Sequence, residues 1–178
     1  ARHCFAEHGF HGTTTARIAS RADVSEPVLY QHFKNKLGLF HALLEEVFQA
    51  SVTHTEDVIE GKPNGAEKIR ALIADYPSFT SECSEAFHVL DRALAGSGDE
   101  KARELLRGYY GRFADRIQSI IAEGQADGSI RATADAKGVA WLLLMTGVGF
   151  RLVGGLGGGD DEELAERLAG VIERIVAP

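Results

Sequence analysis

The sequence has 178 residues, enough for one domain or one domain with a small addition, and its 44% hydrophobic and 25% charged residues are typical of a globular rather than a disordered chain. Its longest apolar run, residues 139–148, is far shorter than the roughly 20 residues of a membrane-spanning helix, and its N-terminus lacks a signal-peptide pattern, which predicts a cytoplasmic protein without a membrane partner. The net charge of −7 divides into +2 over residues 1–36 and −9 over residues 37–178, which indicates two partners of different kinds.

Apolar residues recur at steps of three and four almost throughout, and no segment alternates with period two, so the sequence predicts an all-α fold of about nine helices. The first is a short helix that lacks its start and ends at Gly9, a residue suited to a helix C-terminus. The threonines at positions 13–15 then offer N-caps for a second short helix, which places Ile18 and Ala19 on its inner face.

A third short helix follows after a tight turn, and Ser25 is expected to cap it. Ile18, Val24 and Leu29 can close a small core between the second and third helices. Residues 15–33 therefore have the spacing of a helix-turn-helix motif, whose second helix is free to enter the major groove of DNA. A packed helical corner without a DNA role shares this spacing and stays an alternative.

The remaining helices are expected over residues 36–56, 66–80, 84–95, 100–127, 134–153 and 160–176. The helix over 134–153 is apolar on nearly every side, and so small a monomer can hardly bury all of that surface. We therefore expect the last two helices to pack against their symmetry mates as a four-helix dimer interface. The residues expected there are Leu142, Thr146, Phe150, Leu164, Leu168, Val171, Ile172 and Ile175.

A ligand pocket is expected among the middle helices, where aromatic and polar side chains are mixed. Such a mixture suits a mostly apolar small molecule that is fixed by a few polar contacts. Aromatic residues at helical spacing more often belong to an ordinary core, and both interpretations stay open. The pocket candidates are Tyr76, Phe79, Phe87, His88, Tyr109, Arg112, Phe113, Trp141 and Met145.

The N-terminal segment resembles the N-terminal domain of the TetR family of bacterial transcriptional regulators. The similarity covers about residues 4–44, and beyond it only the helical layout is similar. Asp23 stands in the turn where the family usually has Gly, and Asp tolerates a left-handed conformation better than most residues. The residues that carry the similarity are Phe5–Phe10, Thr13, Thr14, Ile18, Ala19, Val24, Ser25 and Leu29–Lys36.

The resemblance implies an all-helical homodimer with a DNA-binding domain over residues 1–44 and a larger ligand-binding and dimerisation domain over residues 45–178. Hydroxyls and free amides at the start of the second helix favour a phosphate, and Tyr30 and Lys36 match phosphate anchors of the family. Gln31 can pair with adenine, Glu26 with cytosine and Val28 with a thymine methyl. The full set of expected DNA contacts is Thr13, Thr14, Thr15, Arg17, Ser25, Glu26, Pro27, Val28, Tyr30, Gln31, His32 and Lys36.

Other kinds of site lack support in the sequence. The two cysteines, Cys4 and Cys83, cannot form a disulfide framework, and the histidines at positions 3, 8 and 11 have no fixed geometry for a metal. The glycine-rich segment 154–159 follows no strand and precedes four acidic residues that would repel a phosphate. With no catalytic motif present, we expect neither a cofactor nor an enzymatic activity.

The sequence thus predicts a ligand-responsive repressor that binds a palindromic operator as a homodimer and is released by a small, mostly apolar effector. One alternative is a dimeric helical ligand-binding or adaptor protein with weak or lost DNA binding, which the truncated first helix and the acidic second domain favour. Another alternative is an unrelated helical-bundle enzyme.

Overall fold

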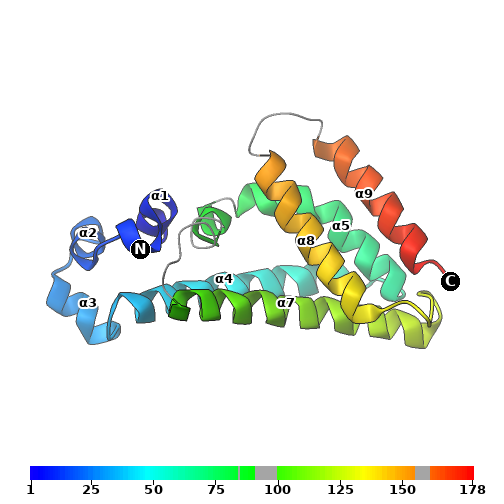
Figure 1. Ribbon diagram of the computed structural model, residues 1–178, viewed down its shortest axis with the longest axis horizontal. Coiled ribbons are helices and arrows are strands. Elements are labelled where there is room, and N and C mark those ends of the chain that lie inside the picture. The colour runs from blue at the N-terminus through cyan, green and yellow to red at the C-terminus, as the bar shows by residue number, and fades with distance from the viewer. Residues whose placement is uncertain (84, 91–99, 155–160) are drawn as a thin grey trace. The chain divides into compact units, whose positions relative to one another are not determined.

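The computed structural model describes residues 1–83, 85–90, 100–154 and 161–178, and within them it contains helices and no strand (Figure 1). The all-α prediction is confirmed, and residues 85–90 are helical as well. The helices are α1 (Arg2–Gly12), α2 (Thr15–Arg21), α3 (Glu26–His32), α4 (Lys36–Ile59), α5 (Gly65–Glu82), α7 (Glu100–Asp127), α8 (Ala136–Gly154) and α9 (Asp161–Val176).

The observed boundaries agree with the expected ones to within a few residues, α4 being longer by one turn at its end. Part of the expected helix over 84–95 and nearly all of the glycine-rich segment 154–159 lie outside the described residues. Among the helices that the structure describes, none has both the length and the apolar character needed to cross a membrane.

The chain divides into two compact units. The first comprises Ala1–Ala50 and Cys83–Tyr109, and the second comprises Ser51–Glu82 and Tyr110–Pro178. Helices α4 and α7 each contribute residues to both units. The boundary at residue 44 between a DNA-binding and a ligand-binding domain stays a prediction.

Three phenylalanine rings form the centre of the N-terminal part of the first unit. Phe5, Phe10 and Phe40 are all buried, and the Phe40 ring centroid lies 5.3 Å from that of Phe5 and 5.1 Å from that of Phe10. Gly9 interrupts α1 between the first two rings with φ 67°, a left-handed conformation that favours glycine. The predicted helix end at Gly9 is therefore a break within α1, and the helix resumes for one short turn to Gly12.

The turn between α2 and α3 ends α2 with a Schellman motif. The Val24 amide donates to the Ala19 carbonyl oxygen at 3.0 Å, the Asp23 amide donates to the Ser20 carbonyl oxygen at 3.3 Å, and Asp23 has φ 53°. The left-handed conformation expected for Asp23 is thus present. Val24, which we expected in the small core, is 39% exposed, because the turn holds it at the rim with its amide directed back onto Ala19.

Replacing Asp23 by glycine should stabilise the protein. We expect Asp23→Gly to raise the free energy of unfolding by about 1 kcal/mol, since glycine adopts a positive φ without the steric cost that a side chain incurs. As a control, Asp57→Gly within α4 should lower it by about 0.3 kcal/mol, because glycine is a slightly poorer helix former than aspartate. Urea denaturation followed by circular dichroism measures both, and an Asp23→Gly protein less stable than the wild type would contradict the role assigned to this turn.

The core of the second unit consists of aliphatic side chains from α4, α5, α7, α8 and the segment after α7. Its buried members are Ile59, Ile69, Ile117, Ile120, Ile121, Ile130, Val139 and Ala140. At one point of this core α5 and α7 touch through their backbones: a Cβ atom placed on Gly65 would lie 2.3 Å from the Gly124 Cα. Glycine at both positions permits this approach.

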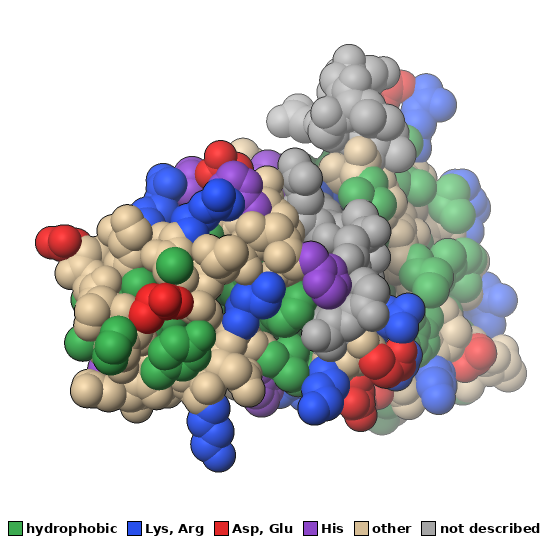
Figure 2. Space-filling model, turned by 60° about the vertical axis from the view of Figure 1, so that its left-hand side comes forward, with side chains coloured by type: hydrophobic (Ala, Val, Ile, Leu, Met, Phe, Trp, Pro, Cys, Tyr) green, Lys and Arg blue, Asp and Glu red, His purple; other side chains and the backbone are tan. Residues whose placement is uncertain are grey.

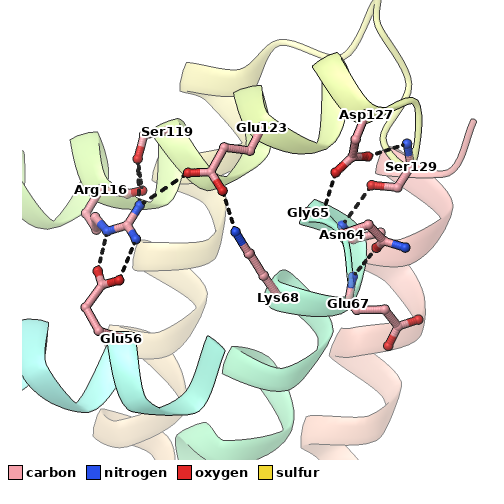
Figure 3. A network of polar contacts seen from close by, with 11 residues as sticks. Glu56, Asn64, Gly65, Glu67, Lys68, Arg116, Ser119, Glu123, Asp127 and Ser129 are labelled. Carbon is pink, nitrogen blue, oxygen red and sulfur yellow. Dashed lines mark hydrogen bonds and ion pairs between the residues drawn. The ribbon is translucent and has the colours of Figure 1, made fainter. Parts of the chain in front are cut away.

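Side chains from the end of α7 cap the start of α5 beside that contact (Figure 3). Asp127 Oδ2 accepts from the Gly65 amide at 2.9 Å, and Ser129 Oγ accepts from the Ala66 amide at 3.1 Å. Hydrogen bonds from Ser129 and from the Gly65 amide hold the pKa of Asp127 below its usual value. The first amides of a helix lack intrahelical acceptors, so these bonds fix α5 to α7 at the tightest point of the core.

Ion pairs join α4, α5 and α7 in the same region (Figure 3). The Arg116 guanidinium donates to both Glu56 carboxylate oxygens, at 2.7 and 2.9 Å, and the Lys68 ammonium donates to Glu123 at 2.6 Å. The hydrogen bonds from Arg116 lower the pKa of Glu56. Both pairs are partly exposed, so we assign them a modest contribution to stability.

Candidate DNA-binding site

The start of α2 and the middle of α3 present hydroxyl groups on one exposed surface. Thr14 is the N-cap of α2, and its Oγ1 accepts from the Arg17 amide at 3.2 Å. The Tyr30 hydroxyl on α3 lies 3.0 Å from Thr15 Oγ1, and the Tyr30 side chain is 47% exposed. Two helices therefore place neighbouring hydroxyls at the surface, as the sequence predicted for this segment.

Thr13 is directed inward, in contrast to the two threonines that follow it. It is fully buried, and its Oγ1 donates to main-chain acceptors of α1, with the Cys4 oxygen at 2.8 Å and the Gly9 oxygen at 2.7 Å. The hydroxyl of Thr13 is thus used to hold α1 against the α2 junction. The sequence could not separate Thr13 from Thr14 and Thr15, because all three offer the same group.

Lys36 at the start of α4 is bound to this same junction. Its Nζ donates to the Thr13 carbonyl oxygen at 3.0 Å and lies 4.6 Å from the centroid of the Phe10 ring, a cation–π arrangement. The half-buried ammonium group therefore connects α4 to the α1–α2 junction. Lys36 thus has a structural role in the first unit, and its role as a phosphate anchor stays a prediction.

Helix α3 turns one side inward and leaves the rest exposed. Leu29 is 8% exposed and packs inward, whereas Val28 is 38% exposed and Gln31 is also at the surface. Ser25 occupies the N-cap position as predicted, but its side chain makes no capping hydrogen bond. The exposed face contains no lysine or arginine from α3 itself.

The surface of the first unit that faces the viewer in Figure 2 carries hydrophobic, basic and acidic side chains in separate small groups. Arg17 on α2 is exposed, with Nη1 3.4 Å from the Gly12 carbonyl oxygen. Of the other expected DNA contacts, Pro27 and His32 are exposed and Glu26 is half-buried. The structure thus brings most of the expected contact residues onto α2 and α3 with their side chains accessible.

An ion pair and a histidine–carboxylate hydrogen bond connect α1 to the rest of the first unit. Arg2 Nη2 lies 2.6 Å from Glu46 Oε1 on α4, and His3 Nδ1 lies 3.1 Å from Glu85 Oε1 in the helical residues 85–90. Within the described residues no group of His, Cys, Asp and Glu has an arrangement that could hold a metal ion.

The predicted pocket candidates fall into both units. Phe87, His88 and Tyr109 belong to the first unit, in which Phe87 and Tyr109 are buried and His88 is exposed. The other six belong to the second unit. There Met145 is 65% exposed and Phe79 is 8% exposed, so the candidates include both surface and core positions.

One polar pair beside these candidates was missed in the sequence. His54 Nε2 on α4 lies 2.5 Å from Asp75 Oδ2 on α5, and the His54 ring stacks on Phe79 with a centroid distance of 4.2 Å. Nearby, Tyr76 packs against Gly147 of α8 and receives a hydrogen bond from Arg151 at 3.4 Å. Two features of the sequence could have pointed to this pair: a histidine within the apolar pattern of α4, and an aspartate next to the pocket candidate Tyr76.

The outer faces of α8 and α9 carry an apolar stripe. Its members are Leu142, Met145 and Leu152 on α8 and Leu164, Val171 and Ile175 on α9, with exposed fractions between 37% and 65%. Ile172, which we expected in the dimer interface, is only 3% exposed, because α9 packs against α5 on that side. Val171 and Ile175 on the same helix are exposed.

Residues 1–43 match the model of the family described as bacterial regulatory proteins, tetR family. This N-terminal segment is therefore similar to the N-terminal segment of the tetR family. Its 30% identity over 90 residues with the HTH-type transcriptional activator FasR of Mycolicibacterium smegmatis covers 51% of this chain and 41% of that protein. Its 27% identity over 135 residues with the fatty acid metabolism regulator protein of Bacillus subtilis covers 74% and 68%. The match to FasR thus spans less than half of that relative's length.

Solved structures of TetR-family proteins have the same fold over nearly the whole chain. One is described as a TetR-family transcriptional regulator from Rhodococcus sp., with TM-score 0.86 and 21% identity over 99% of this chain and 94% of that one. Another is the transcriptional regulator FadR of Bacillus subtilis in complex with stearoyl-CoA, with TM-score 0.83 and 20% identity over 97% and 93%. The TetR family and these neighbours are transcriptional regulators and not enzymes.

Proposed function

We propose that this protein binds a palindromic DNA operator as a homodimer, represses transcription there, and is released by a small, mostly apolar effector. The observation that carries the proposal is the α2–α3 surface. Thr14, Thr15 and Tyr30 lie close enough together there to contact one segment of the DNA backbone, and Gln31 is exposed on the same helix as Tyr30. Phosphate contacts position a protein on DNA, and side chains at the base edges select the sequence. Since its partner would be DNA, we expect the protein in the cytoplasm.

A dimer is supported by the apolar stripe on α8 and α9. Six large hydrophobic side chains on α8 and α9 are each more than one-third exposed, and exposed apolar surface of this kind is typical of interaction sites. A two-fold interface would bury the stripe against its own copy. It would also present two α3 helices to successive major grooves, about 34–36 Å apart.

The response to an effector would pass through α4 and residues 85–90. Arg2 and His3 connect α1 to these two segments through Glu46 and Glu85, so a shift of either segment changes the position of the DNA-binding helices. An effector that prefers the shifted state would lower the affinity for DNA. The stearoyl-CoA complex of FadR supports an effector with a long apolar part.

Tyr30 and Lys36 test this proposal by two different routes. We expect Tyr30→Ala to weaken operator binding about tenfold, because it removes a hydroxyl at the phosphate-facing surface. Lys36→Ala should weaken binding by a similar factor and also lower the thermal stability, since Lys36 Nζ binds the Thr13 carbonyl oxygen. Gel-shift titration on the DNA upstream of the gene measures the affinities, and calorimetry measures the stability.

Lys137→Ala is the matched control for charge, because Lys137 is an exposed residue on α8 in the second unit. It should leave the affinity for DNA unchanged. If all three variants bind as the wild type does, the α2–α3 surface is not the DNA contact. The protein would then act as a helical ligand-binding or adaptor protein, which the charge of −9 over residues 37–178 favours.

A further inference from the structure

We infer that the exposed face of α3 is built to select A·T base pairs, with Val28 against a thymine methyl group and Gln31 on an adenine in the same half-site. This inference rests on the proposed function, because it specifies the DNA sequence that the α2–α3 surface would bind. It is carried by three observations: the directions of the α3 side chains, the apolar character of one flank, and the lack of lysine and arginine in α3.

The position of Leu29 fixes the direction of every other side chain on α3. Leu29 points into the protein and is 8% exposed. Successive residues of a helix are rotated by about 100°, so Pro27 and Gln31 each lie about 160° away from Leu29, and Val28 and Tyr30 lie about 100° away on opposite flanks. Pro27 and Gln31 therefore project most directly outward, towards the floor of a groove that α3 would enter.

The two flanks of α3 differ in chemistry. On one flank the Tyr30 hydroxyl lies 3.0 Å from Thr15 Oγ1. This flank therefore lies beside the start of α2, which is proposed to contact the DNA phosphates. On the other flank Val28 is 38% exposed, and Val24 in the preceding turn is 39% exposed. The apolar group that the major groove offers to such a flank is the C5-methyl of thymine.

Helix α3 lacks the basic side chains that make the commonest contact to guanine. A bidentate bond to guanine O6 and N7 requires arginine or lysine, and α3 contains neither. The amide of Gln31 matches adenine, since it can accept from N6 and donate to N7. Val28 and Gln31 are three residues apart, about 5–6 Å between their Cβ atoms, and base pairs are stacked about 3.4 Å apart, so both contacts fall within neighbouring base pairs.

The test begins with selection of duplexes from a random pool by the intact protein. Each thymine of the enriched half-site is then replaced by uracil, which removes only the methyl group. At one position we expect uracil to weaken binding about fourfold, the value of one buried methyl group. In Val28→Ala this difference between thymine and uracil should disappear, whereas the control Val58→Ala, on α4 in the second unit, should retain it.

Gln31→Ala provides the second arm of the same experiment. The wild type should prefer adenine to 7-deazaadenine, which lacks the N7 acceptor, at one position next to the sensitive thymine, and Gln31→Ala should lose that preference. Selective binding without any uracil effect, or with an effect that Val28→Ala retains, would overturn the inference and leave the proposed function in place. Failure to select any sequence would overturn both.

Discussion

Gly65→Ala is expected to lower the free energy of unfolding by about 3 kcal/mol or more, the upper range for adding a methyl group where no space exists. The added Cβ would lie 2.3 Å from the Gly124 Cα, 2.4 Å from the Gly124 amide nitrogen and 3.0 Å from the Ile120 carbonyl oxygen. All three are backbone atoms, so no side-chain rotation relieves the clash. The start of α5 would have to leave α7, and the hydrogen bonds that the Gly65 and Ala66 amides donate to Asp127 and Ser129 would be lost with it.

Two further glycine variants make this prediction specific. Gly124→Ala should destabilise less, because its clashes below 3 Å, at 2.6 and 2.7 Å, are with the side-chain atoms Cδ1 and Cγ1 of Ile130, whereas its nearest backbone atom, the Gly65 Cα, lies at 3.2 Å. Gly108→Ala, on an exposed turn of the same helix with nothing within 4 Å of the added atom, should stabilise the protein by about 1 kcal/mol. Urea denaturation gives all three values. Equal stabilities of Gly65→Ala and Gly108→Ala would refute the close approach of α5 and α7.

Val171→Asp is expected to convert the proposed dimer into a monomer, with dimer affinity reduced on the order of 100-fold or more, because a carboxylate would be buried without a partner in the proposed interface. Val171 is 45% exposed in the protomer, so the substitution should leave the fold of each protomer intact. Ala122→Asp introduces the same carboxylate on an exposed position of α7 and should have no effect. Light scattering at micromolar concentration measures the mass, and circular dichroism checks the fold.

An unchanged dimer in Val171→Asp would place the interface elsewhere than on α9. A wild-type monomer at micromolar concentration would contradict the role of the entire stripe on α8 and α9. Because DNA binding by two α3 helices depends on the dimer, we also expect the affinity of Val171→Asp for a palindromic duplex to fall.

Local signals in the sequence predicted the N-terminal elements well. Helix termini and turns depend on a few neighbouring residues, so residue type and spacing indicated an N-cap among the threonines at positions 13–15, one of which, Thr14, is the N-cap of α2. The left-handed conformation of Asp23 was expected from the resemblance to the TetR family, which usually has Gly in this turn. The break at Gly9 was also foreseen, but the helical turn that follows it was not, since residues 10–12 are held by the packing of Phe10 against Phe40.

Contacts between distant segments could not be predicted in the same way. Gly65 and Gly124 are 59 positions apart, and neither glycine differs in its sequence surroundings from one that simply ends a helix. Ile172 fits the spacing of both faces of α9, and only the packing of α5 decides that it points inward. The pairing of His54 with Asp75 depends in the same way on how α4 and α5 are placed side by side.

Protection of DNA by the intact protein tests the central claim most directly. Footprinting on the DNA upstream of the gene, at low salt, should show two protected half-sites related by a two-fold axis and centred about one helical turn apart, with two protomers bound per duplex. The affinity should fall linearly with salt on logarithmic axes, as expected for phosphate contacts. A uniform, sequence-independent protection at every salt concentration, or none at all, would contradict the account.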